Sequence, residues 1–341
     1  MMTQYYRKGK PFFYSTSSRQ VRLLQMSESE SEKSNARLKK GEVVEASHGN
    51  YVVMRLLGEG GFGAVYRVEN RETKREYAMK VEYKSRKQSK LKMEIAILRA
   101  FDSMARKSYH FTRIVDRGKA EGFQFVVMTL VGPSLEDMKK ERPNKVFTPG
   151  TAFGAGIQCL EAIEQLHRQQ YIHRDIKPAN YARGLELERR IIFLLDFGIA
   201  RKFTNENGDL KTPRNKVPFK GTVRFAAINC HRHKELSPKD DVESWIYLLL
   251  DFLVVGGLPW KKFSDKEDVL LCKMESRKPE RRNKVLFGNM KCDSILGRVV
   301  DYVDKLTYTD HVDYGFIYDH MKLASAACQA NIEDPYDWEK S

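Results

Sequence analysis

The sequence has 341 residues, of which 41% are apolar and 31% are charged, and these proportions exclude a fibrous or wholly disordered chain. Its five cysteines lie far apart with no C-x-x-C pair, which argues against a disulfide framework or a zinc site and favours reduced thiols in the cytosol or nucleus. The formal net charge of +15 suits a nucleic-acid binder or an enzyme for acidic or phosphorylated substrates, so charge alone does not choose between them.

The first part of the chain predicts a polar arm followed by a small β-rich lobe. Residues 1–47 lack sustained hydrophobic periodicity and include an alternating serine–glutamate run, Ser27 to Glu32, so we expect them to be disordered. A helical spacing of apolar residues then covers 90–101. Short apolar and β-branched runs predict strands over 51–57, 64–68, 76–81, 112–116 and 123–129.

The remainder of the chain has mainly helical patterns. Amphipathic helices are predicted over 151–168 and 242–255. The most apolar run, 245–260, is interrupted by Asp251 and is too short to span a bilayer, so we expect a buried helix and no transmembrane segment. The predicted fold is α+β with one two-lobed domain and a short tail: arm 1–47, domain 48–327 (lobes about 48–131 and 132–327) and C-terminal tail 328–341.

A glycine-rich sequence follows the first predicted strand. Gly58-Glu59-Gly60-Gly61-Phe62-Gly63 matches G-x-G-x-x-G, in which backbone N–H groups can approach phosphate oxygens because glycine has no Cβ. Dinucleotide-binding folds share this spacing, but a helix follows their glycines, whereas here the strand-like segment 64–68 follows. The order of elements therefore favours the glycine loop of a protein kinase.

A lysine and a glutamate downstream fit the same interpretation. Tyr77-Ala78-Met79-Lys80 corresponds to the V-A-I-K motif, so Lys80 is expected to hold the α- and β-phosphates of ATP. Glu94, on the predicted helix 90–101, is the natural carboxylate partner of Lys80. Either residue taken singly could instead be an ordinary surface charge.

The strongest signal is a pair of motifs in the second half of the chain. His173-Arg174-Asp175-Ile176-Lys177-Pro178-Ala179-Asn180 matches H-R-D-x-K-P-x-N, and Asp196-Phe197-Gly198 follows as D-F-G. Phosphoryl transfer needs the positioning of a highly charged group more than covalent help. Asp175 is expected to orient the substrate hydroxyl, Lys177 to neutralise the transferred phosphate, and Asn180 and Asp196 to hold Mg²⁺. We expect His173 and Phe197 to be structural.

With these motifs, the chain from Tyr51 to Ala324 resembles the casein kinase I superfamily, and within it is most similar to tau-tubulin kinases. Segments with this likeness are Leu91-Lys92-Met93-Glu94, Phe203-Thr204-Asn205, Phe219-Lys220-Gly221-Thr222-Val223-Arg224 and Leu258-Pro259-Trp260-Lys261-Lys262. Gly132-Pro133-Ser134-Leu135-Glu136-Asp137 looks more like casein kinase I proper. Most protein kinases have A-P-E after the activation loop, and the casein kinase I superfamily usually has Ser-Ile-Asn there. This chain has Ala227-Ile228-Asn229, so it lacks the serine hydroxyl.

The resemblance implies a bilobal protein kinase fold and particular roles for several residues. Met128 is then the gatekeeper, and main-chain groups of Thr129 and Val131, in the hinge with Leu130, are expected to bind adenine. Asp241 is expected to anchor the catalytic loop as structural support. The complete predicted ATP site comprises Leu57, Gly58, Glu59, Gly60, Gly61, Phe62, Gly63, Val65, Ala78, Lys80, Met128, Thr129 and Val131.

Substrate choice is also suggested. Lys177 together with Thr222 is typical of serine/threonine kinases, so we expect phosphate transfer from ATP, with Mg²⁺, to protein hydroxyls. We predict an anion pocket that favours acidic or already phosphorylated sites, although a solvated basic surface is an alternative. The pocket residues are Arg174, Arg201, Lys220 and Arg224. The resemblance further suggests cytoskeletal substrates such as tubulin. We also expect a monomer, no nucleic-acid partner, and a cytoplasmic or nuclear location.

Two other function classes compete with an active kinase. A pseudokinase scaffold would bind partners through the same fold, but such proteins commonly lack a catalytic residue, and all of these are present here. A nucleic-acid-binding protein would explain the positive charge, but no binding motif accompanies it. The sequence therefore favours an active serine/threonine kinase.

Overall fold

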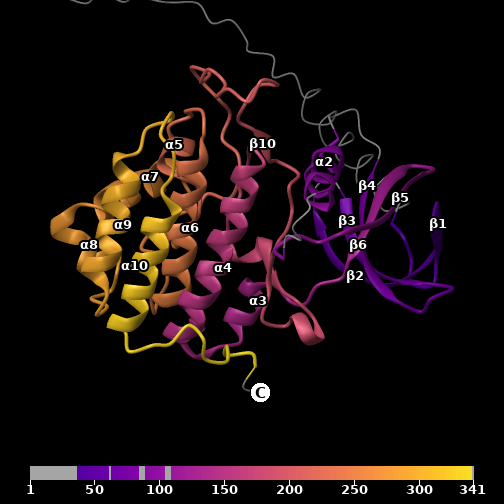
Figure 1. Ribbon diagram of the computed structural model, residues 1–341, viewed down its shortest axis with the longest axis horizontal. Coiled ribbons are helices and arrows are strands. Elements are labelled where there is room, and N and C mark those ends of the chain that lie inside the picture. Colours follow the sequence, from indigo (N-terminus) through magenta and orange to yellow (C-terminus); the bar gives the residue numbers. More distant parts are fainter. Residues whose placement is uncertain (1–36, 61–62, 84–88, 104–108, 340–341) are drawn as a thin grey trace, which may run out of the picture.

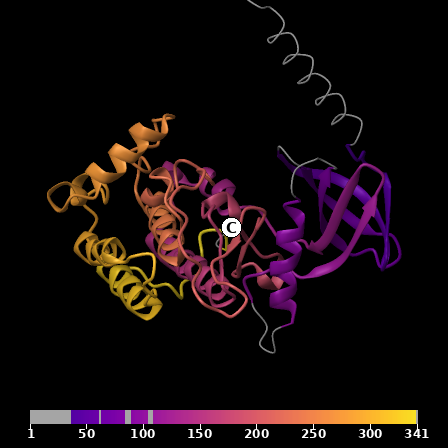
Figure 2. The same cartoon turned by 90° about the horizontal axis from the view of Figure 1, so that it is seen from above.

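The protein folds into two lobes of unequal size, and the computed structural model describes residues 37–60, 63–83, 89–103 and 109–339. The smaller lobe holds the main β-sheet and one labelled helix, and the larger lobe is mainly helical (Figure 1). In the view turned by 90° the two lobes again stand side by side, joined by a narrower region (Figure 2). The predicted α+β fold with a small β-rich lobe and a larger helical lobe is therefore confirmed.

The small lobe is built on a six-stranded antiparallel sheet with the order β1-β2-β3-β4-β6-β5. Strand β3 alternates buried and partly buried residues, as expected for a strand with one face on the core, whereas β6 is buried at four consecutive residues. Helix α2 (Leu91–Asp102) packs beside β5 and β6 with Ile97, Leu98 and Phe101 buried. The strands are β1 (Val43–Ala46), β2 (Gly49–Gly60), β3 (Gly63–Asn70), β4 (Glu76–Tyr83), β5 (Ile114–Ala120) and β6 (Phe123–Thr129).

The structure differs from the predicted arm over its last residues. Residues 1–36 lie outside the described part, but Val43–Ala46 form β1 and pair with β2. Leu38 and Val44 are buried in the core of the small lobe. The expectation of disorder up to residue 47 is therefore wrong for 37–47, because a four-residue strand gains its order from pairing with β2 and has too few residues to show periodicity.

The large lobe is organised around α4 (Pro149–Arg168) and α6 (Pro238–Leu253), which pack directly on each other. Trp245 is fully buried and its indole N–H donates to the Gly156 carbonyl at 2.7 Å. The helix predicted over 242–255 thus starts earlier, at Pro238, and ends at Leu253, before two glycines with positive φ.

Further elements surround these two helices. The helices are α3 (Leu135–Lys140), α5 (Ile228–His231), α7 (Lys266–Ser276), α8 (Pro279–Val285), α9 (Asp293–Lys305) and α10 (Tyr314–Ala327), with 3₁₀ turns at Pro143–Lys145, Pro178–Asn180 and Glu186–Glu188. Four short strands lie near the junction of the lobes: β7 (Tyr171–Ile172), β8 (Tyr181–Arg183), β9 (Ile192–Leu194) and β10 (Arg201–Lys202). Among the described residues, no helix has the length and apolarity needed to cross a bilayer.

The segment after α10 returns along the lower edge of the large lobe (Figure 1). Asp337 accepts hydrogen bonds from the Thr148 backbone N–H at 2.8 Å and from its hydroxyl at 2.6 Å. The Trp338 ring packs edge-on against Phe147 with a centroid distance of 5.5 Å. A carboxylate near the beginning of a helix satisfies otherwise unpaired N–H groups, so this segment caps α4 from a distant part of the sequence.

Candidate active site

Residues from both lobes meet around the Lys80 ammonium. Lys80 lies on β4, and its Nζ pairs with the Glu94 carboxylate of α2. The same Nζ lies 2.9 Å from Oδ1 of Asp196, which follows β9 in the large lobe. The predicted Lys80–Glu94 pair is therefore formed, and it is joined to the D-F-G aspartate.

The charges of these three groups depend on burial and on one another. Burial alone would lower the pKa of Lys80, but Glu94 and Asp196 raise it above its ordinary value. Burial raises the pKa of Glu94, although Lys80 opposes this effect. For Asp196 burial acts in the same upward direction, but the Lys80 ammonium overcomes it and lowers the pKa to about 2. Lys80 and Asp196 are thus both charged at neutral pH.

The glycine loop forms the hairpin between β2 and β3. Gly63 pairs with Glu82 of β4, and a Cβ on Gly63 would lie only 1.9 Å from the Val81 carbonyl oxygen, so only glycine fits there. Apart from chain neighbours, no atom of the described residues lies within 4 Å of the position that a Cβ on Gly58 or Gly60 would take, which leaves room for a ligand on that side of the backbone. Gly61 and Phe62 lie outside the described residues.

The apolar residues predicted to contact adenine form one cluster. Ala78 and Met128 are register partners on β4 and β6, and both are buried. Val65 and Leu130 pack against them. The Thr129 backbone N–H donates to the Arg113 carbonyl at 3.0 Å and so fixes the start of the hinge. Leu57, at the end of β2, has an exposed side chain.

The catalytic loop brings Asp175, Lys177 and Thr222 into one hydrogen-bonded group. Lys177 Nζ donates to Asp175 Oδ2 at 2.8 Å and to the Thr222 hydroxyl at 2.9 Å. The Thr222 hydroxyl in turn donates to Asp175 Oδ1 at 2.8 Å. Both carboxylate oxygens of Asp175 are therefore held by donors, and its orientation is fixed before a substrate arrives.

A buried carboxylate supports this loop from α6. Asp241 accepts backbone hydrogen bonds from His173 at 2.6 Å and Arg174 at 2.9 Å, and a third from His167 Nε2 at 2.9 Å. Arg174 has a left-handed backbone with φ +70, a conformation that is costly for a residue with a Cβ. The anchoring expected for Asp241 thus agrees with the geometry.

The two residues predicted to be structural are both buried. His173 accepts from the Asp175 backbone N–H through Nδ1 at 3.2 Å and faces the Leu195 carbonyl through Nε2 at 3.1 Å. The Phe197 ring packs on His173 with a centroid distance of 5.5 Å and on Phe111 at 5.7 Å. Because both nitrogens of His173 face main-chain groups, the ring has no contact suited to proton transfer.

The donor set at the junction of the lobes fits a divalent cation. Asn180 Nδ2 donates to the Asp175 carbonyl at 2.8 Å, so its oxygen is the atom suited to a cation. Asp196 is ionised at neutral pH, as its lowered pKa of about 2 requires, and its side chain is 53% exposed. One carboxylate and one amide oxygen, completed by phosphate and water, match the preference of Mg²⁺ for a few hard oxygen ligands.

The cations of the predicted anion pocket are only partly brought together. Arg174 donates through Nε to the Ile199 carbonyl at 2.7 Å, and burial together with the neighbouring Arg201 lowers its pKa. Arg201 Nε lies 3.4 Å from the buried carboxylate of Glu235. Arg214, which the sequence analysis did not select, makes a two-point ion pair with the same carboxylate.

The other two predicted cations lie elsewhere on the loop. Lys220 lines a small hollow together with Arg174 and Asp241. The Arg224 guanidinium lies 6.0 Å from the Phe225 ring centre, and the Arg224 carbonyl accepts from the Trp260 indole at 2.7 Å. No hydrogen bond or ion pair links the Arg224 side chain to a partner shared with Arg201 among the described residues, and the anion pocket stays a prediction.

Sequence reasoning missed several residues of this region. His167 supports Asp241, Glu235 gathers two arginines, and Lys273 reaches the loop that contains Thr222. None of them lies in a motif. A histidine in the last turn of a long helix and a lysine in an amphipathic helix are ordinary surface patterns, so only the fold reveals their contacts.

Phosphoryl transfer from a metal-bound nucleoside triphosphate requires three groups that this site contains. They are a lysine held by an ion pair (Lys80), a carboxylate suited to a metal ion (Asp196) and an oriented carboxylate for the acceptor hydroxyl (Asp175). The chain matches the protein kinase domain family over residues 51–302 and belongs to that family. Members of the family use ATP and a divalent metal.

Three relatives illustrate this membership. The chain is 32% identical over 272 residues to a putative serine/threonine-protein kinase of Caenorhabditis elegans, covering 77% of this chain and 78% of that one. It is 30% identical over 288 residues to a putative casein kinase I of the same organism (83% and 82%). It is 29% identical over 292 residues to a probable serine/threonine-protein kinase of Dictyostelium discoideum, a match covering 85% of this chain but 57% of that relative. The protein is a serine/threonine protein kinase, distantly related to casein kinase I homologues.

Proposed function

We propose that the kinase transfers the γ-phosphate of ATP to serine or threonine with the predicted residues in their predicted roles. Asp175 orients the acceptor hydroxyl and takes its proton as the new O–P bond forms, while the bond from the γ-phosphorus to the β–γ bridging oxygen breaks and ADP leaves with that oxygen. Lys177, which already donates to Asp175 at 2.8 Å, neutralises the transferred group. Lys80 holds the α- and β-phosphates. Asn180 and Asp196 would hold Mg²⁺, which when bound would supply positive charge to the phosphate oxygens.

The single observation behind this proposal is the fixed orientation of Asp175 by Lys177 and Thr222. The experiment is transfer of radiolabelled phosphate from ATP with Mg²⁺ to casein, with Asp175→Asn as the matched control. We expect phosphoserine or phosphothreonine from the wild type and a loss of about 10²-fold or more in the variant. A folded wild type that binds ATP without transfer would instead support a scaffold.

We further propose that the enzyme prefers acidic or already phosphorylated sites. The support is the basic surface beside the catalytic loop: Arg174 directly precedes Asp175, and Arg201 and Arg214 lie on the following segment. Burial alone would raise the pKa of Glu235, but Arg214 and Arg201 pair with its carboxylate and keep that pKa below its ordinary value. An incoming carboxylate or phosphate has the same chemistry as this internal partner.

Two variants test this preference with a pair of peptides that differ only in acidic residues near the acceptor. Arg224→Ala is expected to raise KM for the acidic peptide by about tenfold and to leave KM for the neutral peptide nearly unchanged. Glu235→Gln frees the arginines from their internal partner and should lower KM for the acidic peptide. Arg298→Ala, on an exposed position of α9, is the control. Equal effects on both peptides would contradict the proposal.

That the enzyme is related to tau-tubulin kinases, within the casein kinase I superfamily, is also a proposal. The tau-tubulin kinase-like segments favour cytoskeletal substrates such as tubulin, and we propose that the enzyme phosphorylates it. Purified enzyme is incubated with tubulin and with casein under the same conditions. Labelled casein beside unlabelled tubulin would remove this proposal but not the kinase activity.

We propose that the enzyme acts as a monomer in the cytoplasm or nucleus. All five cysteines are free thiols, as expected for a reducing compartment. Light scattering of the purified protein gives its mass in solution, and a fluorescent fusion shows its location in cells.

A further inference from the structure

Four carbonyl groups of the loop that contains Thr222 accept hydrogen bonds, and three of them accept from side chains outside the loop. Within residues 222–226, here called the substrate loop, the Thr222 carbonyl accepts from the backbone N–H groups of Phe225 and Ala226. The Arg224 carbonyl accepts from the Trp260 indole at 2.7 Å. The carbonyls of Val223 and Ala226 accept from one side chain, Lys273 of α7, at 3.0 and 2.6 Å. The position of this loop therefore depends on groups outside it.

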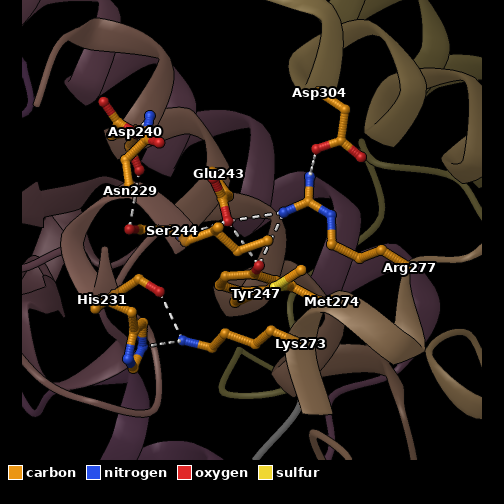
Figure 3. A network of polar contacts seen from close by, with 12 residues as sticks. Asn229, His231, Asp240, Glu243, Ser244, Tyr247, Lys273, Met274, Arg277 and Asp304 are labelled. Atoms are coloured by element: carbon orange, nitrogen blue, oxygen red, sulfur yellow. Dashed lines mark hydrogen bonds and ion pairs between the residues drawn. The ribbon is translucent and has the colours of Figure 1, made fainter. Parts of the chain in front are cut away.

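Lys273 is unusual because it is fully buried. Its side chain has 0% exposure, although lysine is among the residues least often found inside a protein. The third N–H of the ammonium faces His231 Nε2 of α5 at 3.1 Å. Figure 3 shows Lys273 extended from α7 towards His231, below Tyr247. Its three donors thus meet two carbonyls and one imidazole.

Among the residues that the structure describes, no carboxylate forms an ion pair with the Lys273 ammonium, and aromatic rings lie near its positive charge instead. The ammonium lies 4.9 Å from the Tyr247 ring centre and 5.3 Å from that of Trp260, distances at which aromatic faces attract cations. The nearby Glu243 carboxylate pairs with Arg277 at 2.7 Å instead (Figure 3). Burying a lysine here costs free energy, and the contacts obtained in return are with the substrate loop.

We infer that Lys273 is a positioning residue for the protein substrate: its ammonium holds the substrate loop so that the Thr222 hydroxyl meets Asp175 and the loop presents a fixed surface to the peptide. The path is short. Lys273 fixes the carbonyl of Val223, the residue next to Thr222, and Thr222 donates to Asp175 Oδ1 at 2.8 Å. Lys273 touches neither the expected ATP site nor the acceptor, so it acts through the loop. The inference rests on the kinase activity and not on the preference for acidic sites.

Titration of Lys273 supplies a second consequence of this geometry. Burial lowers the pKa of Lys273 to about 7, and burial together with Lys273 lowers the pKa of His231 to about 4, so His231 stays neutral and can accept. Hydrogen bonds from a cation are roughly twice as strong as those from a neutral amine, so the loop is held less firmly above pH 7. The titratable and charged groups around Lys273 are Cys230 and His231 of α5, Glu243 and Tyr247 of α6, and Cys272 and Arg277 of the α7 region. Asp240 of α6, whose pKa burial raises to about 7, titrates in the same pH range.

The experiment compares Lys273→Met and Lys273→Arg with a control, Lys284→Met, at an exposed position of α8. Three quantities are measured for each folded protein: KM for a neutral peptide, KM for ATP, and ATP hydrolysis without peptide. For Lys273→Met we expect peptide KM to rise by about tenfold, as for the loss of a charge-assisted hydrogen bond. The other two quantities should change by less than about twofold, because the expected ATP site lies outside the substrate loop and Lys177 still donates to Asp175 at 2.8 Å. The control should match the wild type.

A pH profile separates positioning from a merely structural role. Wild-type peptide KM is expected to rise roughly threefold between about pH 6 and about pH 8, whereas Lys273→Arg stays charged and its KM stays flat. This comparison also carries the test if Lys273→Met does not fold. An unchanged peptide KM in Lys273→Met, or an equal loss of ATP hydrolysis, would overturn the inference. A rise of KM that is equal in wild type and Lys273→Arg would assign the titration to another group, such as Asp240, and would overturn it as well.

Discussion

Lys80 Nζ lies 2.9 Å from Asp196 Oδ1 while it also pairs with the Glu94 carboxylate. One ammonium therefore connects α2 and β4 of the small lobe with the loop after β9 in the large lobe. Glu94 is nearly inaccessible, with a side-chain exposure of 4%, whereas Asp196 is half exposed. Removing the ammonium thus affects the two carboxylates unequally.

Lys80→Met should impair both catalysis and stability. Loss of a preorganised cation at the phosphates is expected to lower kcat/KM by about 10²-fold or more. Because Glu94 is then buried without its cation, the free energy of unfolding at neutral pH should fall by about 2–3 kcal/mol, less than for a fully buried pair since Lys80 is 24% exposed. Lys92→Met, on the exposed side of α2, is the control.

The stability loss of Lys80→Met should also depend on pH. Without Lys80 the folded-state pKa of Glu94 lies further above its unfolded value, so the unfavourable charge is present above the folded pKa and disappears as pH falls through it. Urea denaturation of wild type and variant is compared at about pH 5 and about pH 7.5. A difference that is the same at both pH values would contradict burial of an unpaired Glu94.

Thr222→Val tests the hydroxyl that connects the substrate loop with Asp175. Valine keeps the shape but removes one hydrogen bond to the carboxylate and one from Lys177. We expect kcat/KM for a peptide to fall by about tenfold, whereas Thr222→Ser, which retains the hydroxyl, should stay within about threefold of wild type. Steady-state kinetics with one peptide distinguishes them, and equal losses would show that the methyl group matters rather than the hydroxyl.

Asp241→Asn should weaken the hydrogen bonds that anchor the catalytic loop to α6. The carboxylate accepts from two backbone N–H groups and from His167, and burial, which alone would raise its pKa, is outweighed by these donors so that its pKa is lowered. We expect a loss of about 2–4 kcal/mol in the free energy of unfolding and a fall in kcat. For the wild type this contribution is present above the unfolded pKa and is lost as pH falls below about 4. Asp319→Asn, on the exposed side of α10, should leave chemical denaturation unchanged.

Asp337→Ala should destabilise the fold without affecting the chemistry. It removes the acceptor for the Thr148 N–H and hydroxyl at the first turn of α4, and loss of a helix cap costs about 1–2 kcal/mol. Thermal denaturation measures the effect, and KM and kcat below the transition should equal those of wild type. Asp334→Ala, in the exposed turn just before, is the control, and an equal change in both variants would argue against capping.

Much of the active site could be predicted because its residues lie in short contiguous motifs. Asp175, Lys177 and Asn180 are within six consecutive positions, so their proximity follows from the chain itself. The pairing of Lys80 with Glu94 could be predicted because the strand that contains the motif lysine is followed by the helix that contains the glutamate. Where one motif fixes the backbone, the sequence is sufficient.

Other contacts could not be predicted because their partners lie far apart in the sequence. Strand β1 exists because β2 pairs with it, and the cationic surface depends on Glu235, which no motif includes. From the sequence alone Lys273 is an ordinary helix lysine, and only the fold shows that two carbonyl groups accept hydrogen bonds from it. Long-range pairing, rather than local pattern, decides these features.

The cap of α4 has a consequence for the time order of folding. The acceptor for the Thr148 N–H is Asp337, 189 residues further along the chain. During synthesis, which proceeds from the N-terminal end, α4 leaves the ribosome with its first turn uncapped and stays so until those residues have been added. The central helix of the large lobe thus completes its hydrogen bonds only after most of the surrounding helices have been made. A nascent chain stalled before Asp337 would contain both catalytic motifs, but α4 would still lack the hydrogen bonds that Asp337 accepts at its first turn.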